Sequence, residues 1–178
     1  EALAEVLIKE DYKFLKDFLR SHPEPVILDI GHHIGCFSIW ALSQNPKARI
    51  TALEADPQTY KIAAHNASLA RKSGFDWNVS HHAAWKNDEP VPFSCQGDTM
   101  GHKVDHTASL HVDGMSLETL LEGIKKPVTL MKVDIEGAEE AFLAGKSDHL
   151  KHIENLVIEL HPKLCNQEAV LETLKDRY

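Results

Sequence analysis

The feature that most constrains the fold is an alternation of short apolar runs with segments of helical periodicity. The apolar run 26–30 leads into a glycine turn, after which Ile34, Phe37 and Ala41 follow at helical spacing. Such strand–turn–helix units are typical of parallel βαβ construction. We therefore expect an α/β fold with a mostly parallel central sheet. The expected strands are 26–30, 49–53, 77–82, 128–133 and 156–160.

The segments around these strands complete the expected domain. Residues 3–25 have apolar side chains at helical spacing and predict a helix that packs across the sheet. Pro57 begins a second crossover helix, and the last residues predict the helix after strand five. The stretch 87–113 is polar and irregular, with weak strand alternation near 107–112, and excursions of this kind are usually functional or disordered. We expect one domain over 1–178, with a helical segment 1–25 and a core 26–178.

Composition excludes several classes of protein. A chain of 178 residues with 43% hydrophobic residues can bury a proper core, and its net charge of −8 disfavours nucleic-acid binding. Three cysteines without close spacing give neither a disulfide framework nor a zinc motif, which favours a reducing cytoplasm. No apolar run approaches the roughly 20 residues that span a bilayer, so we expect no membrane insertion. The sequence begins with Glu1, and we expect the native start to be missing.

A glycine turn and an acidic residue predict a ligand site at the carboxyl edge of the sheet. Asp29 and Gly31 end the first strand, and the turn to Gly35 brings backbone N–H groups to a helix N-terminus. Glu54 ends the second strand 19 residues later (54 − 35), near the offset at which an acidic side chain meets a ribose in nucleotide-binding folds. The turn lacks the G-x-G-x-x-G register, which makes NAD or FAD a poorer fit.

Five motifs in order resemble one family. The runs "LDIGHHIGCFSIWAL", "ITALEADP", "SLETLL", "LMKVDIEGAEEAFLAG" and "NLVIELHP" are similar to the FkbM family of S-adenosylmethionine-dependent methyltransferases, over roughly 26–162. The resemblance implies a Rossmann-like class I methyltransferase three-layer sandwich and O-methylation, commonly of sugar or polyketide hydroxyls. It also implies that the turn 31–35 cradles the methionine part of the cofactor, that Glu54 pairs with its ribose, and that Ala55 and 83–85, with Ala84, lie near adenine. The class I sheet normally ends in an antiparallel hairpin, which we expect this chain to lack.

The two adjacent histidines depart from the family pattern. The family usually reads D-x-G-A-N-x-G, and here His32 stands at the alanine and His33 at the asparagine. Histidine, like asparagine, is enriched among residues that accept positive φ, so His33 can hold the turn. We favour loop occupants over an added contact with cofactor or acceptor, and over metal ligation. The implied cofactor-binding set is Asp29, Gly31, His32, His33, Ile34, Gly35, Glu54, Ala55, Ala84 and Asp134.

A second acidic motif supplies the catalytic candidates. Asp134 and Glu136 follow strand four at the same sheet edge, where one carboxylate can hold the cofactor's amino group and the other the acceptor hydroxyl. Glu139 and Glu140 are interpreted as first-turn acids that complement the helix dipole. His161 closes strand five and is either the base for the acceptor hydroxyl or a structural strand-end residue.

The resulting hypothesis is an S-adenosylmethionine-dependent O-methyltransferase of a small sugar-like or natural-product acceptor, with Asp134, Glu136 and His161 as catalytic candidates and no assigned metal. Two alternatives stay open. One is a cofactor-binding but inactive regulatory or interaction module, motivated by the altered loop. The other is a metal-assisted O-methyltransferase in which Asp134 and Glu136 ligate a divalent cation.

Overall fold

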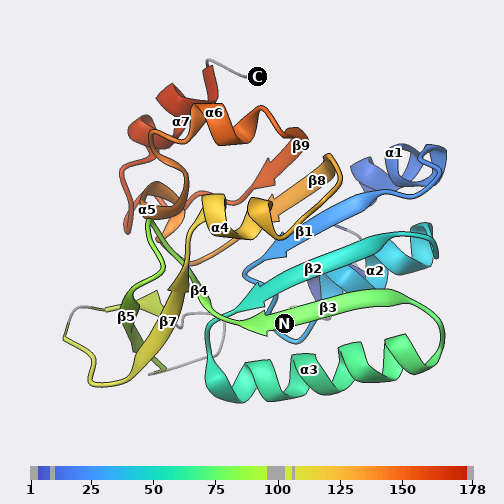
Figure 1. Cartoon of the computed structure of the whole chain (residues 1–178), viewed down its shortest axis with the longest axis horizontal. Helices are drawn as coiled ribbons and strands as arrows, with labels where there is room; N and C mark the ends of the chain where they lie inside the picture. The colour runs from blue at the N-terminus through green and yellow to red at the C-terminus, as the bar shows by residue number, and fades with distance from the viewer. Residues whose placement is uncertain (1–3, 9–10, 96–102, 106, 176–178) are drawn as a thin grey trace.

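The central element is a parallel sheet of five strands in the order β3-β2-β1-β8-β9. The computed structural model describes residues 4–8, 11–95, 103–105 and 107–175. The strands are β1 (Val26–Ile30), β2 (Arg49–Glu54), β3 (Asp76–His81), β8 (Val128–Val133) and β9 (Ile153–Ile158). The expected α/β class and parallel sheet are confirmed (Figure 1). β9 begins three residues earlier than the expected strand 156–160 and ends two residues earlier. The earlier start follows from the pairing of Ile153 with Val128 of β8.

Helices cover both faces of this sheet and give a three-layer sandwich (Figure 1). The helices are α1 (Lys16–Ser21), α2 (Cys36–Gln44), α3 (Pro57–Lys72), α4 (Leu117–Glu122), α5 (Glu139–Leu143), α6 (Ser147–Leu150) and α7 (Gln167–Lys175). Strand β1 shows how the layers form, because Ile27 faces one apolar cluster and Leu28 the other. The cluster on the Ile27 side contains buried residues of α1, α2 and α3, whereas the Leu28 side holds those of α4 to α7.

The N-terminal segment is not the single helix that the sequence predicts. It forms a π-helical turn η1 (Ala4–Ile8), a 3₁₀ turn η2 (Lys13–Leu15) and the short helix α1. Between η1 and η2 the ring of Tyr12 packs edge-on against Phe37 of α2, with 4.8 Å between ring centroids. Of the apolar residues at helical spacing, Leu15 and Leu19 are buried as predicted, whereas Phe14 is 65% exposed. Val6 of η1 is also buried. Tertiary packing on α2 therefore overrides one continuous helix here.

The polar excursion is more regular than expected. A second sheet has the order β4-β7-β5-β6, with β4 (Ala83–Ala84), β5 (Pro90–Ser94), β6 (Lys103–Val104) and β7 (His111–Met115). In β5 the prolines at 90 and 92 conceal an alternation in which Val91 and Phe93 are buried. Val112 of β7 joins them in a small apolar cluster. His102 and His106, interpreted from the sequence as loop histidines and not as metal ligands, lie outside the described residues.

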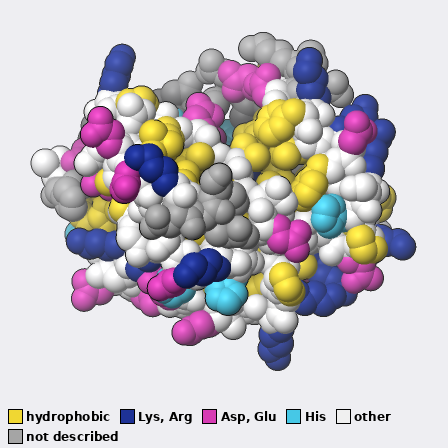
Figure 2. Space-filling view, turned by 90° about the horizontal axis from the view of Figure 1, so that it is seen from above, with side chains coloured by type: hydrophobic (Ala, Val, Ile, Leu, Met, Phe, Trp, Pro, Cys, Tyr) yellow, Lys and Arg dark blue, Asp and Glu magenta, His cyan; other side chains and the backbone are white. Residues whose placement is uncertain are grey.

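Two further features concern the helices and the surface of the molecule. None of the described helices is long and apolar enough to cross a membrane. On the face shown in Figure 2, acidic and basic side chains are interspersed with apolar ones.

Candidate active site

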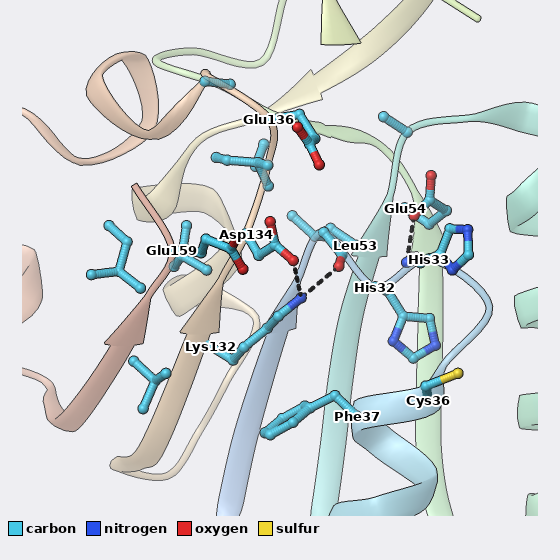
Figure 3. Close-up of a pocket in the computed structure, with 18 of the residues that line it drawn as sticks. His32, His33, Cys36, Phe37, Leu53, Glu54, Lys132, Asp134, Glu136 and Glu159 are labelled. Atoms are coloured by element: carbon cyan, nitrogen blue, oxygen red, sulfur yellow. Dashed lines mark hydrogen bonds and ion pairs between the residues drawn. The ribbon is translucent and has the colours of Figure 1, made fainter. Parts of the chain in front are cut away.

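A cavity of about 510 Å³ opens where the carboxyl ends of β1, β2 and β8 meet the small sheet and the N-terminal segment (Figure 3). Ligands of open α/β sheets bind at this edge because loops after neighbouring strands converge there. The volume lies within the range of small-molecule sites. The sequence-predicted residues that line the cavity are Gly31, His32, His33, Glu54, Ala55, Ala84, Asp134 and Glu136.

The turn after β1 is held by hydrogen bonds to β2. His33 has a φ of 53°, which confirms that it accepts the left-handed conformation, and its N–H donates to Oε2 of Glu54 at 2.7 Å. The other oxygen of Glu54 accepts from the N–H of Asp56 at 2.7 Å. A Cβ on Gly31 would lie 1.6 Å from the carbonyl oxygen of Asp134, so the turn fits tightly against the end of β8. The carboxylate of Glu54 therefore stabilises the turn by a hydrogen bond, and Glu54 also lines the cavity.

The turn offers fewer free N–H groups than the sequence suggests. The N–H groups of Gly31 and His32 both donate to the carbonyl of Leu53, and that of Gly35 donates to the carbonyl of His32. With the bond from His33 to Glu54, four N–H groups of the turn are already bonded within the chain. The turn therefore contributes its shape and carbonyl oxygens rather than an open N–H cradle.

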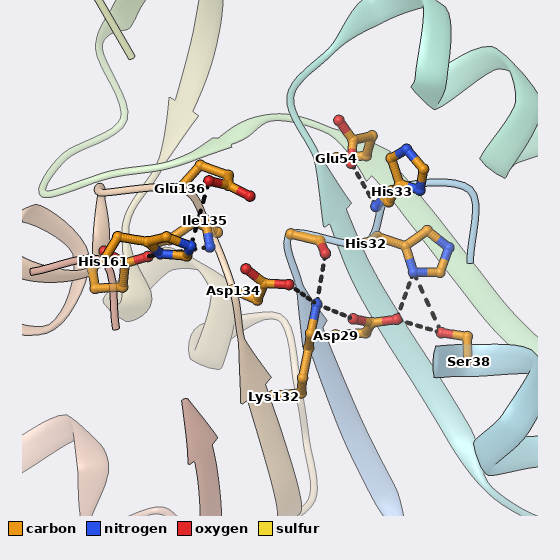
Figure 4. A network of polar contacts seen from close by, with 12 residues as sticks. Asp29, His32, His33, Ser38, Glu54, Lys132, Asp134, Ile135, Glu136 and His161 are labelled. Carbon is orange, nitrogen blue, oxygen red and sulfur yellow. Dashed lines mark hydrogen bonds and ion pairs between the residues drawn. The ribbon is translucent and has the colours of Figure 1, made fainter. Parts of the chain in front are cut away.

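His32 belongs to a buried polar network behind the cavity (Figure 4). Its Nδ1 lies 2.7 Å from Oδ2 of Asp29, and the hydroxyl of Ser38 donates to the same oxygen at 2.7 Å. The ring meets Trp77 edge-on, with 5.3 Å between centroids. Burial opposes ionisation of Asp29, but His32, Lys132 and Ser38 outweigh it and hold the pKa of this carboxyl below its usual value. His32 therefore supports the strand end from beneath the turn.

Lys132 links the turn to the acidic motif. Its ammonium donates to the carbonyl of Gly31 at 2.7 Å and lies 3.6 Å from Asp29 Oδ1 and 3.5 Å from Asp134 Oδ2. Burial lowers the pKa of a lysine, but these two carboxylates raise the pKa of Lys132 well above its ordinary value. Lys132 was not among the predicted site residues, although a lysine within the apolar run 128–133 was a visible signal.

The loop after β8 presents Glu136 to the cavity through a strained turn. Glu136 has a φ of 52° and Gly137 one of 99°. Fully buried Glu139 accepts the N–H of Gly137 at 3.1 Å and makes a 2.8 Å contact with Nδ1 of His161. Nε2 of His161 lies 3.4 Å from Oε2 of Glu136 (Figure 4). Glu139 therefore stabilises the turn and holds the imidazole behind Glu136.

Burial and neighbouring charges shift the pKa values in this loop. Burial, and then repulsion by Asp134, raises the pKa of Glu136, which His161 partly offsets. Burial alone would lower the pKa of His161, but Glu139 and Glu136 raise it above its usual value. Burial would raise the pKa of Glu139, yet the hydrogen bonds from His161 and Gly137 lower it. Glu139 therefore does more than complement the helix dipole.

Four predicted site residues do not line the cavity. Asp29 is buried under the turn, and Ile34 and Gly35 lie at the start of α2, where a Cβ on Gly35 would come 2.5 Å from the ring of Trp77. His161 lies in a turn three residues after β9 rather than on the strand. The lining residues that the sequence analysis did not single out include Tyr12, His82, Phe93, Lys132 and Glu159. Most of these come from segments whose packing the sequence pattern does not specify.

A family model and two curated relatives match this chain. The family model "Methyltransferase FkbM domain" matches residues 29–176. The hexuronic acid methyltransferase AglP of Haloferax volcanii is 28% identical over 142 residues, which cover 78% of this chain and 56% of that protein. Methyltransferase 1 of Beauveria bassiana is 27% identical over 174 residues, covering 84% of this chain and 68% of that protein.

Solved structures show the same fold. A SAM-dependent methyltransferase from Agrobacterium tumefaciens superposes with a TM-score of 0.55 at 13% identity, covering 93% of this chain and 49% of that one. Precorrin-6y C5,15-methyltransferase from Geobacter metallireducens superposes with a TM-score of 0.54 at 17% identity, covering 94% of this chain and 70% of that one. The class I methyltransferase sheet expected from the sequence is thereby confirmed.

Proposed function

The chain belongs to the FkbM methyltransferase domain family, and on that premise we propose that it transfers a methyl group from S-adenosylmethionine to a hydroxyl of a small acceptor. One observation carries the proposal. The glycine turn, Glu54, Asp134 and Glu136 all meet at one cavity of about 510 Å³. When bound, S-adenosylmethionine supplies a methyl group already activated by its sulfonium, so the chain mainly aligns the acceptor and manages one proton.

The residues on the β1 and β2 side fit the cofactor. A carboxylate has about four acceptor positions, and Glu54 uses two for the N–H groups of His33 and Asp56, which leaves capacity for ribose hydroxyls. Asp134 and the carbonyl of Gly31 provide acceptors for the methionine ammonium beside Lys132. Ala83, Ala84 and Phe93 form an apolar wall that fits adenine.

The residues on the β8 side fit the proton transfer. Glu136 lines the cavity and its pKa is raised by burial, which suits a carboxylate that takes a proton from an alcohol. We assign it as the base that receives the proton while the acceptor oxygen bonds to the methyl carbon and the carbon–sulfur bond breaks. His161 and Glu139 then act as positioning residues, because they hold Glu136 from behind.

Thermal unfolding with S-adenosylmethionine, S-adenosylhomocysteine and NAD tests the proposal. Ligand at about 100 times its dissociation constant stabilises the fold by roughly 2.7 kcal/mol. We expect a shift with both sulfur compounds and none with NAD. Glu54→Ala should abolish the shift, whereas Glu24→Ala, an exposed carboxylate outside the cavity, should keep it. No shift with millimolar S-adenosylhomocysteine would overturn the proposal, and binding without methyl transfer to any acceptor would favour an inactive binding module.

A specific cluster favours a metal-assisted variant of the same reaction as a second candidate. Asp134, Glu136 and His161 each offer one ligand atom, and these atoms lie within 4.8 Å of one another. Glu139 on Nδ1 leaves Nε2 of His161 turned toward Glu136, as in a ligating histidine with a carboxylate behind it. A divalent cation here would polarise the acceptor oxygen. Methyl transfer and thermal stability that are unchanged by EDTA and by added Mg²⁺ or Mn²⁺ would eliminate this candidate.

A further inference from the structure

We infer that the acceptor carries a protonated amine close to the hydroxyl that is methylated, as in an amino sugar or an aminocyclitol. The inference rests on the proposed function, because it names the substrate class of the same cavity. It depends on how charge is distributed among the described residues around that cavity.

The lining of the cavity is strongly acidic. Lys132 is the single Lys or Arg among the described lining residues, and the same set has six carboxylates. They are Glu5, Asp11, Glu54, Asp134, Glu136 and Glu159. The ammonium of Lys132 is already engaged by Asp29, Asp134 and the carbonyl of Gly31, and its side chain is only 6% exposed. Within the described lining, no cation therefore remains to meet an anionic acceptor.

The carboxylates fall into two groups by position. Glu54 lies on the β2 side and Asp134 beside the glycine turn, where the cofactor's ribose and ammonium account for them. Glu136 is the proposed base. Glu5 and Asp11, from the N-terminal segment, and Glu159, just after β9, have no part in these roles. These three residues are called the unassigned carboxylates, and they line the same cavity.

Glu159 is one of the unassigned carboxylates at the edge of the cavity. Its N–H donates to the carbonyl of Val133 at 2.9 Å, which fixes the start of the side chain at the cavity edge (Figure 3). Its carboxylate makes no hydrogen bond or ion pair with another residue that the structure describes. Glu159 is exposed at the cavity edge, and Glu5 and Asp134 line the same cavity, so the negative charges of these carboxylates repel one another. The neighbouring Lys132 and His161 are paired with other carboxylates. A protonated amine bound here would relieve this repulsion, whereas the carboxylate of an acidic sugar would add to it.

A comparison of the affinities for three sugars of similar shape tests the inference. Calorimetry on the complex of the full chain with S-adenosylhomocysteine measures the affinity for glucosamine, glucose and glucuronic acid, which differ in charge. We expect glucosamine to bind about fivefold more tightly than glucose, the effect of one solvent-accessible charge pair, and glucuronic acid to bind most weakly. Methyl transfer from S-adenosylmethionine, followed as release of S-adenosylhomocysteine, should rank the sugars in the same order.

A matched pair of variants locates the effect. Glu159→Gln should remove the preference for glucosamine and leave the affinity for S-adenosylhomocysteine unchanged. Glu168→Gln makes the same charge change on α7, outside the cavity lining, and should keep the preference. Equal affinities for the three sugars, no detectable binding of glucosamine, or a preference that survives Glu159→Gln would each overturn the inference. Loss of the preference with EDTA, restored by Mg²⁺, would overturn it in favour of a metal ion. Failure of the proposed function is distinguishable from these outcomes, because in that case S-adenosylhomocysteine itself does not bind.

Discussion

His33 combines an unusual backbone conformation with a direct contact to the candidate cofactor site. Its φ of 53° is one that non-glycine residues seldom adopt, and its N–H is bonded to the carboxylate proposed to hold the ribose. His32, one residue earlier, is buried against Asp29 and Trp77 instead. The two adjacent histidines therefore have different structural roles.

Substitution of His33 separates its conformational role from a chemical one. We expect His33→Ala to lower the free energy of unfolding by about 1 kcal/mol relative to His33→Gly, because glycine accepts positive φ without a steric cost. His33→Asn and His33→Gly should both keep the affinity for S-adenosylhomocysteine. Urea unfolding and calorimetry measure these two quantities. Loss of cofactor affinity in the asparagine and glycine variants alike would instead show that the imidazole contacts the ligand.

Lys132 determines whether two carboxylates can share the strand end. Lys132→Met would leave fully buried Asp29 and partly buried Asp134 without their common cation. We expect a loss of about 3–5 kcal/mol in the free energy of unfolding, typical of an uncompensated buried charge. Lys126→Met, which removes an exposed pair with Glu24, should cost under about 1 kcal/mol. Similar losses in the two variants in urea titrations would contradict the role of Lys132.

At the scale of elements, capping and strand ends position the site. Helix α3 begins directly after β2, and Asp56 caps it by accepting the N–H groups of Gln58 at 3.0 Å and Thr59 at 2.6 Å. The N–H of Asp56 also bonds Glu54, so the same short connection starts the helix and orients the carboxylate. Pro57 and the helical spacing of the apolar residues that follow it predict α3 from the sequence, because both are local signals.

Replacement of the α3 cap tests this connection. We expect Asp56→Ala to lower the free energy of unfolding by about 1 kcal/mol, since two N–H groups of the first turn lose their acceptor. Asp56→Asn should recover most of that loss, because asparagine is an equally good cap. Thermal or urea unfolding measures both variants. An equal loss in the asparagine variant would show that the negative charge, rather than the cap, stabilises the helix.

At the scale of the whole molecule, the buried carboxylates predict acid sensitivity. Asp29 and Glu139 are both fully buried, and their folded pKa values are lowered despite burial. A lowered folded pKa contributes stability that is present above the ordinary carboxyl pKa, about 4, and is lost as the pH falls toward the folded value. We expect the free energy of unfolding to fall below about pH 4.

Urea titrations between about pH 2.5 and 7 follow this loss, because that window spans the ordinary carboxyl pKa values. In Glu139→Gln the free energy of unfolding should fall less steeply with decreasing pH than in the unmodified chain, since one of the titrating carboxylates is gone. Glu168→Gln, on the exposed side of α7, should leave this dependence on pH unchanged. Identical slopes for all three proteins would show that Glu139 does not contribute to acid unfolding.

The sequence by itself determined the succession of strands and helices along the chain after the N-terminal segment, the glycine turn, and the acidic residues at one sheet edge. These follow from periodicity and from the rule that parallel strands end at the same edge. The tertiary structure alone decided the break in the N-terminal helix, the small sheet, the part of Lys132, and the placement of Glu136 in front of His161. Each of these depends on contacts between segments far apart in the chain, such as Tyr12 with Phe37, and local pattern does not encode such contacts.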